Sequence, residues 1–471
     1  DMGAYEGGVP EEDIINLNVA VSPPDGGRTS PASGMTHFYG RGESVLVFVQ
    51  PLGHRFEGWT GMIDSTDRMV AFIAERNGAM TATMTDNIVR VNAAREGDAD
   101  GASWETAYRT IQEGVNAAAV EGGEVWVAQG TYTGIRQTVL NMKPGVSIYG
   151  GFSGNEGDLA QRGPGSFATV IDGEDLNRCV YGADDALLDG FVVTRGHAST
   201  GAGMYNYGRS PQVMNCQFIG NATTLSGGGA VYNSVSNATF INCTFSQNAA
   251  ATGGGAMYNT YSGPRLVNCT LGGNHAGYGG GLCQYGGLTT LVNCILWGDT
   301  GGTTPELANS SGSVTVSYSC IQGGCAGTGN IGDDPLLVDG AGGSLQLREG
   351  SPCKNTGTGG GAPSTDCLGR PRLLDEGVDM GAHEGTAAAS DIVTLTVMKV
   401  PDDGGCTLPE SGTHLHVRGE AVPLLARPAG HRFLSWTGDA SASSPQTAIS
   451  MNSSKSVYAV FEENVVFVNA A

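Results

Sequence analysis

The stretch GGGAVYNSVSNATFINCTFSQNAA at residues 227–250 decides the fold, because it returns as GGGAMYNTYSGPRLVNCTLGGNHA at residues 253–276. Four such periods align on one asparagine: Asn215, Asn242, Asn268 and Asn293. A cysteine follows each asparagine, and a fifth continues the series: Cys216, Cys243, Cys269, Cys294 and Cys320. A second polar position lies six residues after the first: Asn221, Asn248, Asn274 and Asp299. The cysteine spacings of 27, 26, 25 and 26 residues set the period.

This period predicts an all-β protein built on a single-stranded parallel β-helix, whose coils of short strands stack about 4.8 Å apart. A helical repeat is the alternative, but the glycine clusters and β-branched runs argue against it. Inside the coils we expect one row of apolar side chains: Phe218, Phe245, Leu271 and Leu296. Asparagines in register can bond one another from coil to coil, so we interpret them as structural ladders. The cysteines of the series are expected to be small buried residues with free thiols.

A short helix near 103–120 is expected to cap the N-terminal end of the β-helix. Apolar residues recur there with helical spacing, at Trp104, Tyr108, Ile111 and Val115. Ser103 is the expected N-cap, and glycines at 122–123 end the segment. A cap is needed because the end of a stack of strands exposes unpaired edges.

A longer repeat joins the two ends of the chain. DMGAYEG at residues 1–7 returns as DMGAHEG at 379–385. PLGHRFEGWTG at 51–61 returns as PAGHRFLSWTG at 428–438, and VRVNAA at 89–94 returns as VFVNAA at 466–471. We therefore expect a tandem array in which a large module and a small module alternate.

The repeat divides the chain into five parts: a closing strand of a preceding β-helix at 1–7, a small all-β domain at 8–88, the β-helix at 89–385, a second copy of the small domain at 386–465, and the opening strand of a following β-helix at 466–471. The two end strands would join modules or subunits through Asp1, Met2, Gly3, Ala4, Val466, Phe467, Val468 and Asn469. His54 and His431 recur in the small domains without a second histidine at ligand spacing, so a structural role is expected for them.

Several of these motifs, in this order, carry a family resemblance across residues 89–385. The pieces GDADGASWETAYRTIQEGVNAA, EVWVAQGTYTG, GFSGNE and GRPRLLDEGVDMGAHEG resemble bacterial right-handed parallel β-helix proteins of the choice-of-anchor Q type. The rungs are also similar to repeats of chlamydial polymorphic membrane proteins, which are surface adhesins. The small domains resemble divergent internalin B-repeats. The resemblance implies an extracellular or cell-surface protein, and it transfers no catalytic residues.

Composition excludes several classes of protein. The net charge of −22 argues against a nucleic-acid partner. No apolar run approaches the roughly 20 residues of a membrane helix. Glycine makes up 76 of 471 residues but without a three-residue period, which excludes collagen.

The best candidate for catalysis is a charged cluster just before the regular coils, made of Asp184, Asp185, Asp189, Arg195 and His197. Polysaccharide-cleaving β-helices need paired carboxylates, or an acidic cluster with a metal and a base. The competing interpretation is stronger: Asp184 and Asp185 form a solvated turn, and Asp189 takes the place of a ladder asparagine.

Two smaller candidates concern calcium and disulfides. Asp98 and Asp100 alternate before a glycine and could contribute oxygen ligands to Ca²⁺, although the rest of a calcium loop is missing. No other cofactor is expected. Cys353 and Cys367 are a candidate bridge across a glycine-rich loop, and Cys320–Cys325 is a poorer one.

We therefore expect an extracellular structural or adhesive protein, and not an enzyme. Its modules would form a stalk or filament through head-to-tail contacts with itself. The alternative is a carbohydrate-binding or polysaccharide-degrading β-helix. A stack of Tyr205, Tyr232 and Tyr258 could contact surface glycans, although packing is the commoner reason for such a stack.

Overall fold

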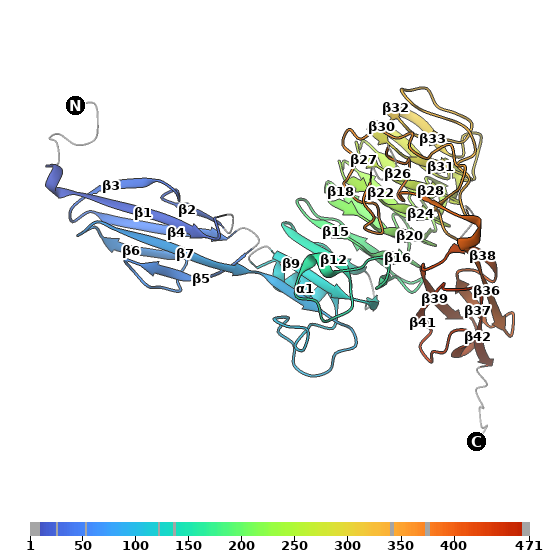
Figure 1. Cartoon of the computed structure of the whole chain (residues 1–471), viewed down its shortest axis with the longest axis horizontal. Helices are drawn as coiled ribbons and strands as arrows, with labels where there is room; N and C mark the ends of the chain where they lie inside the picture. Colours follow the sequence, from blue (N-terminus) through green and yellow to red (C-terminus); the bar gives the residue numbers. More distant parts are fainter. Residues whose placement is uncertain are drawn as a thin grey trace, which may run out of the picture.

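A computed structural model of the chain describes residues 10–24, 27–51, 54–120, 123–134, 138–339, 343–372 and 377–463. It has three parts (Figure 1): a small β domain at the N-terminal side, a stack of β-coils, and a second small β domain beside the stack. The end strands predicted at 1–7 and 466–471 lie outside the described residues. No helix among the described residues is both long and apolar enough to cross a membrane.

Each regular coil contains four short strands. One coil is formed by β18 (Met204–Tyr207), β19 (Gln212–Met214), β20 (Gln217–Ile219) and β21 (Ala222–Thr223). The next is formed by β22 (Val231–Ser234), β23 (Thr239–Ile241), β24 (Thr244–Ser246) and β25 (Ala249–Gly253). Successive coils pair in parallel and in register, for example Val213 with Phe240 and Phe218 with Phe245. The predicted parallel β-helix is therefore confirmed.

Stacking of the coils builds parallel sheets along the sides of the β-helix. One face consists of β10 (Gly130–Thr133), β13 (Thr169–Asp172), β16 (Val192–Thr194), β20, β24, β28 (Thr270–Gly272), β31 (Ile295–Trp297) and β33 (Cys320–Ile321). A second consists of β11 (Thr138–Asn141), β14 (Arg178–Tyr181), β18, β22, β26 (Met257–Thr260), β30 (Leu282–Val292) and β32 (Leu307–Ser317). A third consists of β8 (Ile88–Val91), β9 (Gly123–Ala128), β12 (Val146–Phe152), β15 (Leu187–Asp189), β19, β23, β27 (Arg265–Val267) and the later part of β30. The short strands β17 (His197–Ala198), β21, β25 and β29 (His275–Tyr278) line a fourth edge.

The core is a continuous column inside the coils. Phe218 and Phe245 stack with ring centroids 5.1 Å apart, and Leu271 and Leu296 continue the row with no exposed surface. This column supplies the apolar burial that a single coil could not supply alone.

Helix α1 (Ile111–Ala118) closes the N-terminal end, but it begins later than the sequence suggests. Thr110, not Ser103, is the N-cap, and it forms a capping box with Glu113. Ser103 instead bonds within a local turn to Glu105 and Thr106, and Tyr108 pairs with Val91 as extended chain. The helix buries Ile111 and Val115 in the core of the β-helix, as a cap requires.

The two small domains share one topology. In the first, a sheet of β3 (Thr36–Gly40), β1 (Ile14–Ser22), β7 (Gly78–Asp86) and β5 (His54–Gly61) faces a sheet of β2 (Gly27–Ser30), β4 (Ser44–Pro51) and β6 (Met69–Ile73). In the second, the sheets are β38 (Gly412–Val417), β36 (Ile392–Val400), β42 (Lys455–Glu463) and β40 (His431–Gly438), and β37 (Gly405–Leu408), β39 (Ala421–Pro428) and β41 (Gln446–Ser450). Trp59 and Trp436 occupy the same buried position.

The remaining short elements are η1 (Glu11–Asp13), η2 (Leu159–Gln161), η3 (Ala389–Asp391), β34 (Leu347–Arg348) and β35 (Thr386–Ala387). Most of them lie in segments that connect the longer strands. The described segments between β33 and β36 run back along the outside of the coils, where Arg372 donates to Asn242 at 2.8 Å. This return brings the chain to the flank of the β-helix, where the second small domain lies.

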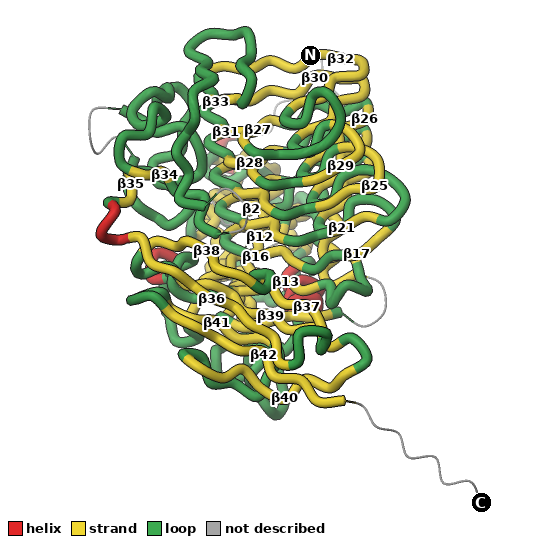
Figure 2. The backbone as a smooth tube through the Cα atoms, turned by 90° about the vertical axis from the view of Figure 1, so that its right-hand side faces the viewer, coloured by secondary structure: helices red, strands yellow, loops and turns green. Residues whose placement is uncertain are grey.

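The two small domains differ in how they meet the β-helix. The first extends away from the capped end, and only Asn87 separates its last strand β7 from β8 of the first coil (Figure 1). The second lies on the flank of the coils, at the lower right in Figure 1 and in front of the lower coils in Figure 2.

Candidate functional site

The predicted charged cluster is divided into separate ion pairs. Asp184 lies in a turn, where it accepts from Arg209 at 2.9 Å and from the amide of Ser210. Asp185 is exposed in the same turn with a positive φ of 53°. These two residues form the solvated turn that the sequence favoured.

Asp189 is buried and takes the place of a ladder asparagine. It accepts from Asn215 at 2.8 Å on one side and from Arg162 at 2.7 Å on the other. Both carboxylate oxygens of Asp189 are therefore engaged, one by an amide and the other by a guanidinium.

Arg195 pairs with Asp172, a buried carboxylate that sequence reasoning missed. The Nε of Arg195 donates to Asp172 at 2.9 Å, and Gln446 of the second small domain also donates to Asp172. His197 is half-buried in β17. Each buried carboxylate of the cluster thus has its own arginine. The cluster contains no free pair of carboxylates of the kind glycoside cleavage uses.

The candidate calcium ligands serve a turn instead. Asp100 accepts from the amide of Ala102 at 2.9 Å, and a further hydrogen bond from Thr106 helps to lower its pKa. Asp98 is exposed beside it. Within the described ranges, no group of three His, Cys, Asp or Glu side chains is placed to hold a metal ion.

The first asparagine series lines a turn between two strands of each coil. Asn215, Asn242, Asn268 and Asn293 all have φ near +50°, a region that asparagine tolerates better than most residues. Asn242 donates to Asn215 at 3.1 Å, and Asn293 donates to Asn268 at 3.2 Å. Between Asn242 and Asn268 the ladder is interrupted, because Asn268 donates instead to the backbone of Asp379 and Gly381.

The second asparagine series is fully buried and ends at a pair of acids. Asn221 donates to Asn248, Asn248 to Asn274, and Asn274 to Asp299, each at 2.8–2.9 Å. Burial raises the pKa of Glu306 to about 7, and burial followed by the charge of Glu306 raises the pKa of Asp299 well above its usual range. Glu306 was not predicted, and no sequence spacing indicates it.

A third ladder escaped sequence reasoning. Asn206 donates to Asn233 at 2.9 Å, and Asn233 donates to Asn259 at 2.8 Å, all three without exposed surface. The signal was present, since each asparagine ends one of the aligned MYN or VYN segments.

The cysteine series is buried, and all eleven cysteines are free thiols. Cys216, Cys243, Cys269, Cys294 and Cys320 have no exposed surface, and burial raises the pKa of Cys216 to about 12. The candidate Cys353–Cys367 bridge is not formed in the structure. Cys353 packs in a satellite core with Cys320 and Met380, because the intervening loop runs along the coils and hydrogen-bonds to Asn293 instead. Cys325 is a separate half-buried thiol.

The tyrosine stack lies on the outer face of the second sheet. Tyr205 and Tyr232 have centroids 5.6 Å apart, and Tyr232 and Tyr258 are 5.2 Å apart. Arg178 lies over Tyr205 at 4.7 Å. Stacked rings cover one another's faces, so their edges point outward. Further tyrosines with exposed rings flank the stack: Tyr181, Tyr207, Tyr261 and Tyr285. We call these seven residues the tyrosine face.

The recurring histidine has no metal site in the second small domain. His431 lies near the backbone oxygen of Ala429, at 3.1 Å from its Nδ1. The side chain of His54 lies outside the part that is described.

Comparison with known proteins supports the assignment of the second small domain. Residues 394–465 match the family of the divergent InlB B-repeat domain. No curated protein matches the chain. Among solved structures, the crystal structure of pectate lyase Pel9A aligns with a TM-score of 0.35 and 13% identity, over 63% of this chain and 96% of that chain.

Proposed function

We propose that the chain is part of an extracellular structural or adhesive protein, in which β-helices and small B-repeat-like domains alternate to form a surface stalk or filament. The observation that carries the proposal is the link between modules. Only Asn87 separates β7 from β8, and β8 is already paired with β9 of the first coil. So short a link favours a stiff rod over domains that are joined by a flexible linker.

The sequence repeat extends this argument. VRVNAA begins at Val89 in the first coil, and VFVNAA follows the second small domain at the equivalent position. A head-to-tail contact repeated in this way gives a fibre when its rotation does not close a ring. The resemblance to choice-of-anchor Q proteins and to chlamydial surface adhesins supports an anchored surface location.

Immunogold labelling of intact source cells, with antibodies against the purified chain, tests this location. We expect gold on the outer surface without permeabilisation. Labelling only after permeabilisation would overturn an extracellular role.

A second candidate function is carbohydrate binding, which the tyrosine face favours. Exposed aromatic rings and hydroxyl groups suit sugar rings. On a glycan array, the pair of changes Tyr207→Ser and Tyr261→Ser should abolish any binding, whereas Leu225→Ser, at an exposed residue without a ring, should not. Binding that is equal in all three proteins would exclude this face.

A further inference from the structure

The two small domains place equivalent strands in equivalent register, so their faces can be compared residue by residue. Phe48 pairs with Met69 in the first domain, and Leu425 pairs with Gln446 in the second. The outward face of β4 and β6 carries Leu46, Phe48, Met69 and Ile73. The matching positions on β39 and β41 are Pro423, Leu425, Gln446 and Ser450. We call the first set the outer face of the first domain.

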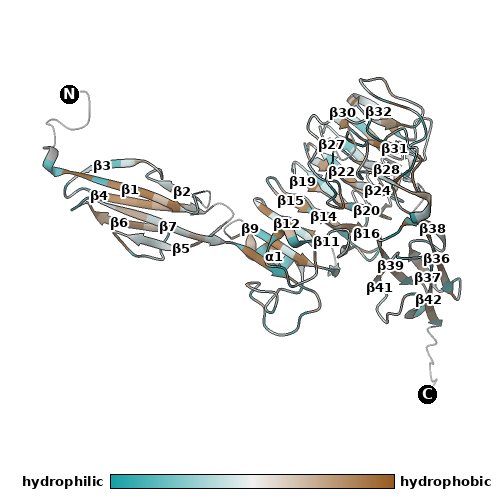
Figure 3. Cartoon of the chain, in the orientation of Figure 1, coloured by the Kyte–Doolittle hydropathy of each residue, from teal (hydrophilic) through white to brown (hydrophobic). Residues whose placement is uncertain are grey.

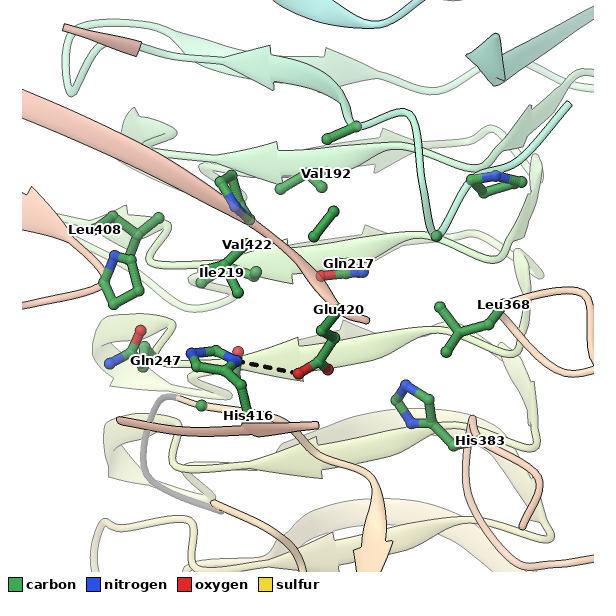
Figure 4. A pocket seen from close by; sticks show the side chains of 18 residues that line it. Val192, Gln217, Ile219, Gln247, Leu368, His383, Leu408, His416, Glu420 and Val422 are labelled. Atoms are coloured by element: carbon green, nitrogen blue, oxygen red, sulfur yellow. Dashed lines mark hydrogen bonds and ion pairs between the residues drawn. The ribbon is translucent and has the colours of Figure 1, made fainter. Parts of the chain in front are cut away.

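In the second domain the β-helix covers part of this face: Leu425 is buried, Pro423 and Gln446 are half-buried, and Ser450 stays exposed. Leu425 is only 1% exposed although it does not belong to the core of its own domain. Leu408 lies against the coils, since a Cβ placed on Gly220 would be 3.4 Å from its Cδ1. A small cavity of about 80 Å³ remains between the two bodies, lined by Val192 and Ile219 from the coils and by Val422 and Pro423 from the domain (Figure 4).

Polar contacts fix the second domain on this flank. Arg427 pairs with Asp175 at 3.3 Å, and the amide of Ser344 donates to the backbone oxygen of Leu415 at 3.0 Å. Gln446 reaches Asp172. The contact is thus a specific interface between a B-repeat-like domain and the side of a β-helix.

In the first domain the large apolar side chains of this face are exposed, and Figure 3 shows hydrophobic stretches along β4 and β6. The exposed fractions are 56% for Leu46, 39% for Phe48, 59% for Met69 and 49% for Ile73. A contiguous group of exposed large apolar side chains on one sheet is typical of an interaction surface. Two positions of this face, Met69 and Ile73, are more apolar than their counterparts Gln446 and Ser450 in the second domain.

We infer that the outer face of the first domain docks on the flank of a parallel β-helix, in the manner in which the second domain docks on β16 and β20. This inference rests on the proposed array, because it names the contact that each small domain makes with the β-helix preceding it. The alternative occupant is a second copy of the outer face itself.

The test compares the present chain with an extended chain in which residues 89–378 are placed before Asp1. The DMGAYEG block at 1–7 then completes the added β-helix as DMGAHEG completes the existing one. Hydroxyl-radical footprinting of Met69 and Phe48 is the readout. In the extended chain the oxidation of both should fall, most strongly for Phe48 because its counterpart Leu425 is buried, while Met35 stays reactive. Met35 is 63% exposed. The second domain has no residue at the position of Met35, and the turn that contains this position is exposed there.

Two controls make the result decisive. Low oxidation of Met257, which has no exposed surface, shows that the coils are folded. Phe48→Lys should restore the oxidation of Met69 in the extended chain. Unchanged oxidation of Met69 in a folded extended chain overturns the inference. So does a dimer of the present chain, seen by sedimentation and abolished by Phe48→Lys. Neither readout depends on whether filaments form, so failure of the array and failure of this contact are distinguishable.

Discussion

The side-chain nitrogen of Asn248 donates to the side-chain oxygen of Asn274 at 2.8 Å, from one coil to the next. The same amide also donates to the backbone of Phe218, and the oxygen of Asn248 accepts from both nitrogens of Asn221. Every hydrogen-bonding group of this buried side chain is therefore used. A ladder of this kind fixes the register of the coils, because a slip by one residue would leave several buried polar groups without partners.

Asn248→Ala should lower the free energy of unfolding of the β-helix by about 3 kcal/mol, because it leaves buried groups on Asn221 and Phe218 unsatisfied. Urea denaturation followed by circular dichroism measures the change. Asn237→Ala, at an exposed position, is the matched control and should stay within about 0.5 kcal/mol of the parent. Equal effects of the two changes would contradict a stabilising role for the ladder.

The acid pair at the end of this ladder predicts that stability depends on pH. The pKa of Glu306 is about 7 in the folded chain and 4.5 for the ordinary side chain, so the folded state holds a proton that the unfolded state releases between these values. The contribution is complete below pH 4.5 and is lost as the pH rises through 7, by on the order of 3 kcal/mol. Between pH 4.5 and pH 8, the denaturation midpoint of the parent protein should fall by more than the midpoint of the Glu306→Gln variant. Parallel pH profiles would contradict this assignment.

The ion pairs of the charged cluster should differ in their contribution to stability. Arg195→Ala leaves Asp172 buried without its partner and should cost about 3–5 kcal/mol of unfolding free energy. Arg209→Ala removes the exposed pair with Asp184 and should cost less than about 1 kcal/mol. The measurement is again urea denaturation. If Arg195→Ala leaves stability unchanged, the pair is not structural, and a chemical role for the cluster deserves a new test.

Thiol titration examines the cysteines. Cys406 is exposed and should react at once with a thiol reagent, Cys325 is half-buried and should react slowly, and the nine buried cysteines should react only after unfolding. The denatured protein should release eleven equivalents without a reducing agent. Nine equivalents would mean that one disulfide exists, and Cys406→Ser should remove only the fast phase.

The regular part of this fold could be predicted from the sequence because its side chains repeat in register. Asn242 and Phe245 return one period later as Asn268 and Leu271, so spacing alone places them on a shared turn and in a shared core. The helix start was misplaced, since Trp104 and Tyr108 have helical spacing but are held by contacts with Glu156 and Val91.

Contacts between distant segments left no such pattern. Asp172 and Gln446 meet across two domains, and nothing near either residue in the sequence indicates the other. Glu306 likewise reaches Asp299 through a loop that does not repeat. The position of the second small domain on the flank could therefore come only from the structure.

Negative-stain electron microscopy of the untreated native material tests the central claim, that these modules belong to a head-to-tail array. We expect long filaments with a regular axial repeat, in which rods alternate with small lateral domains. Isolated short rods at every concentration would contradict it.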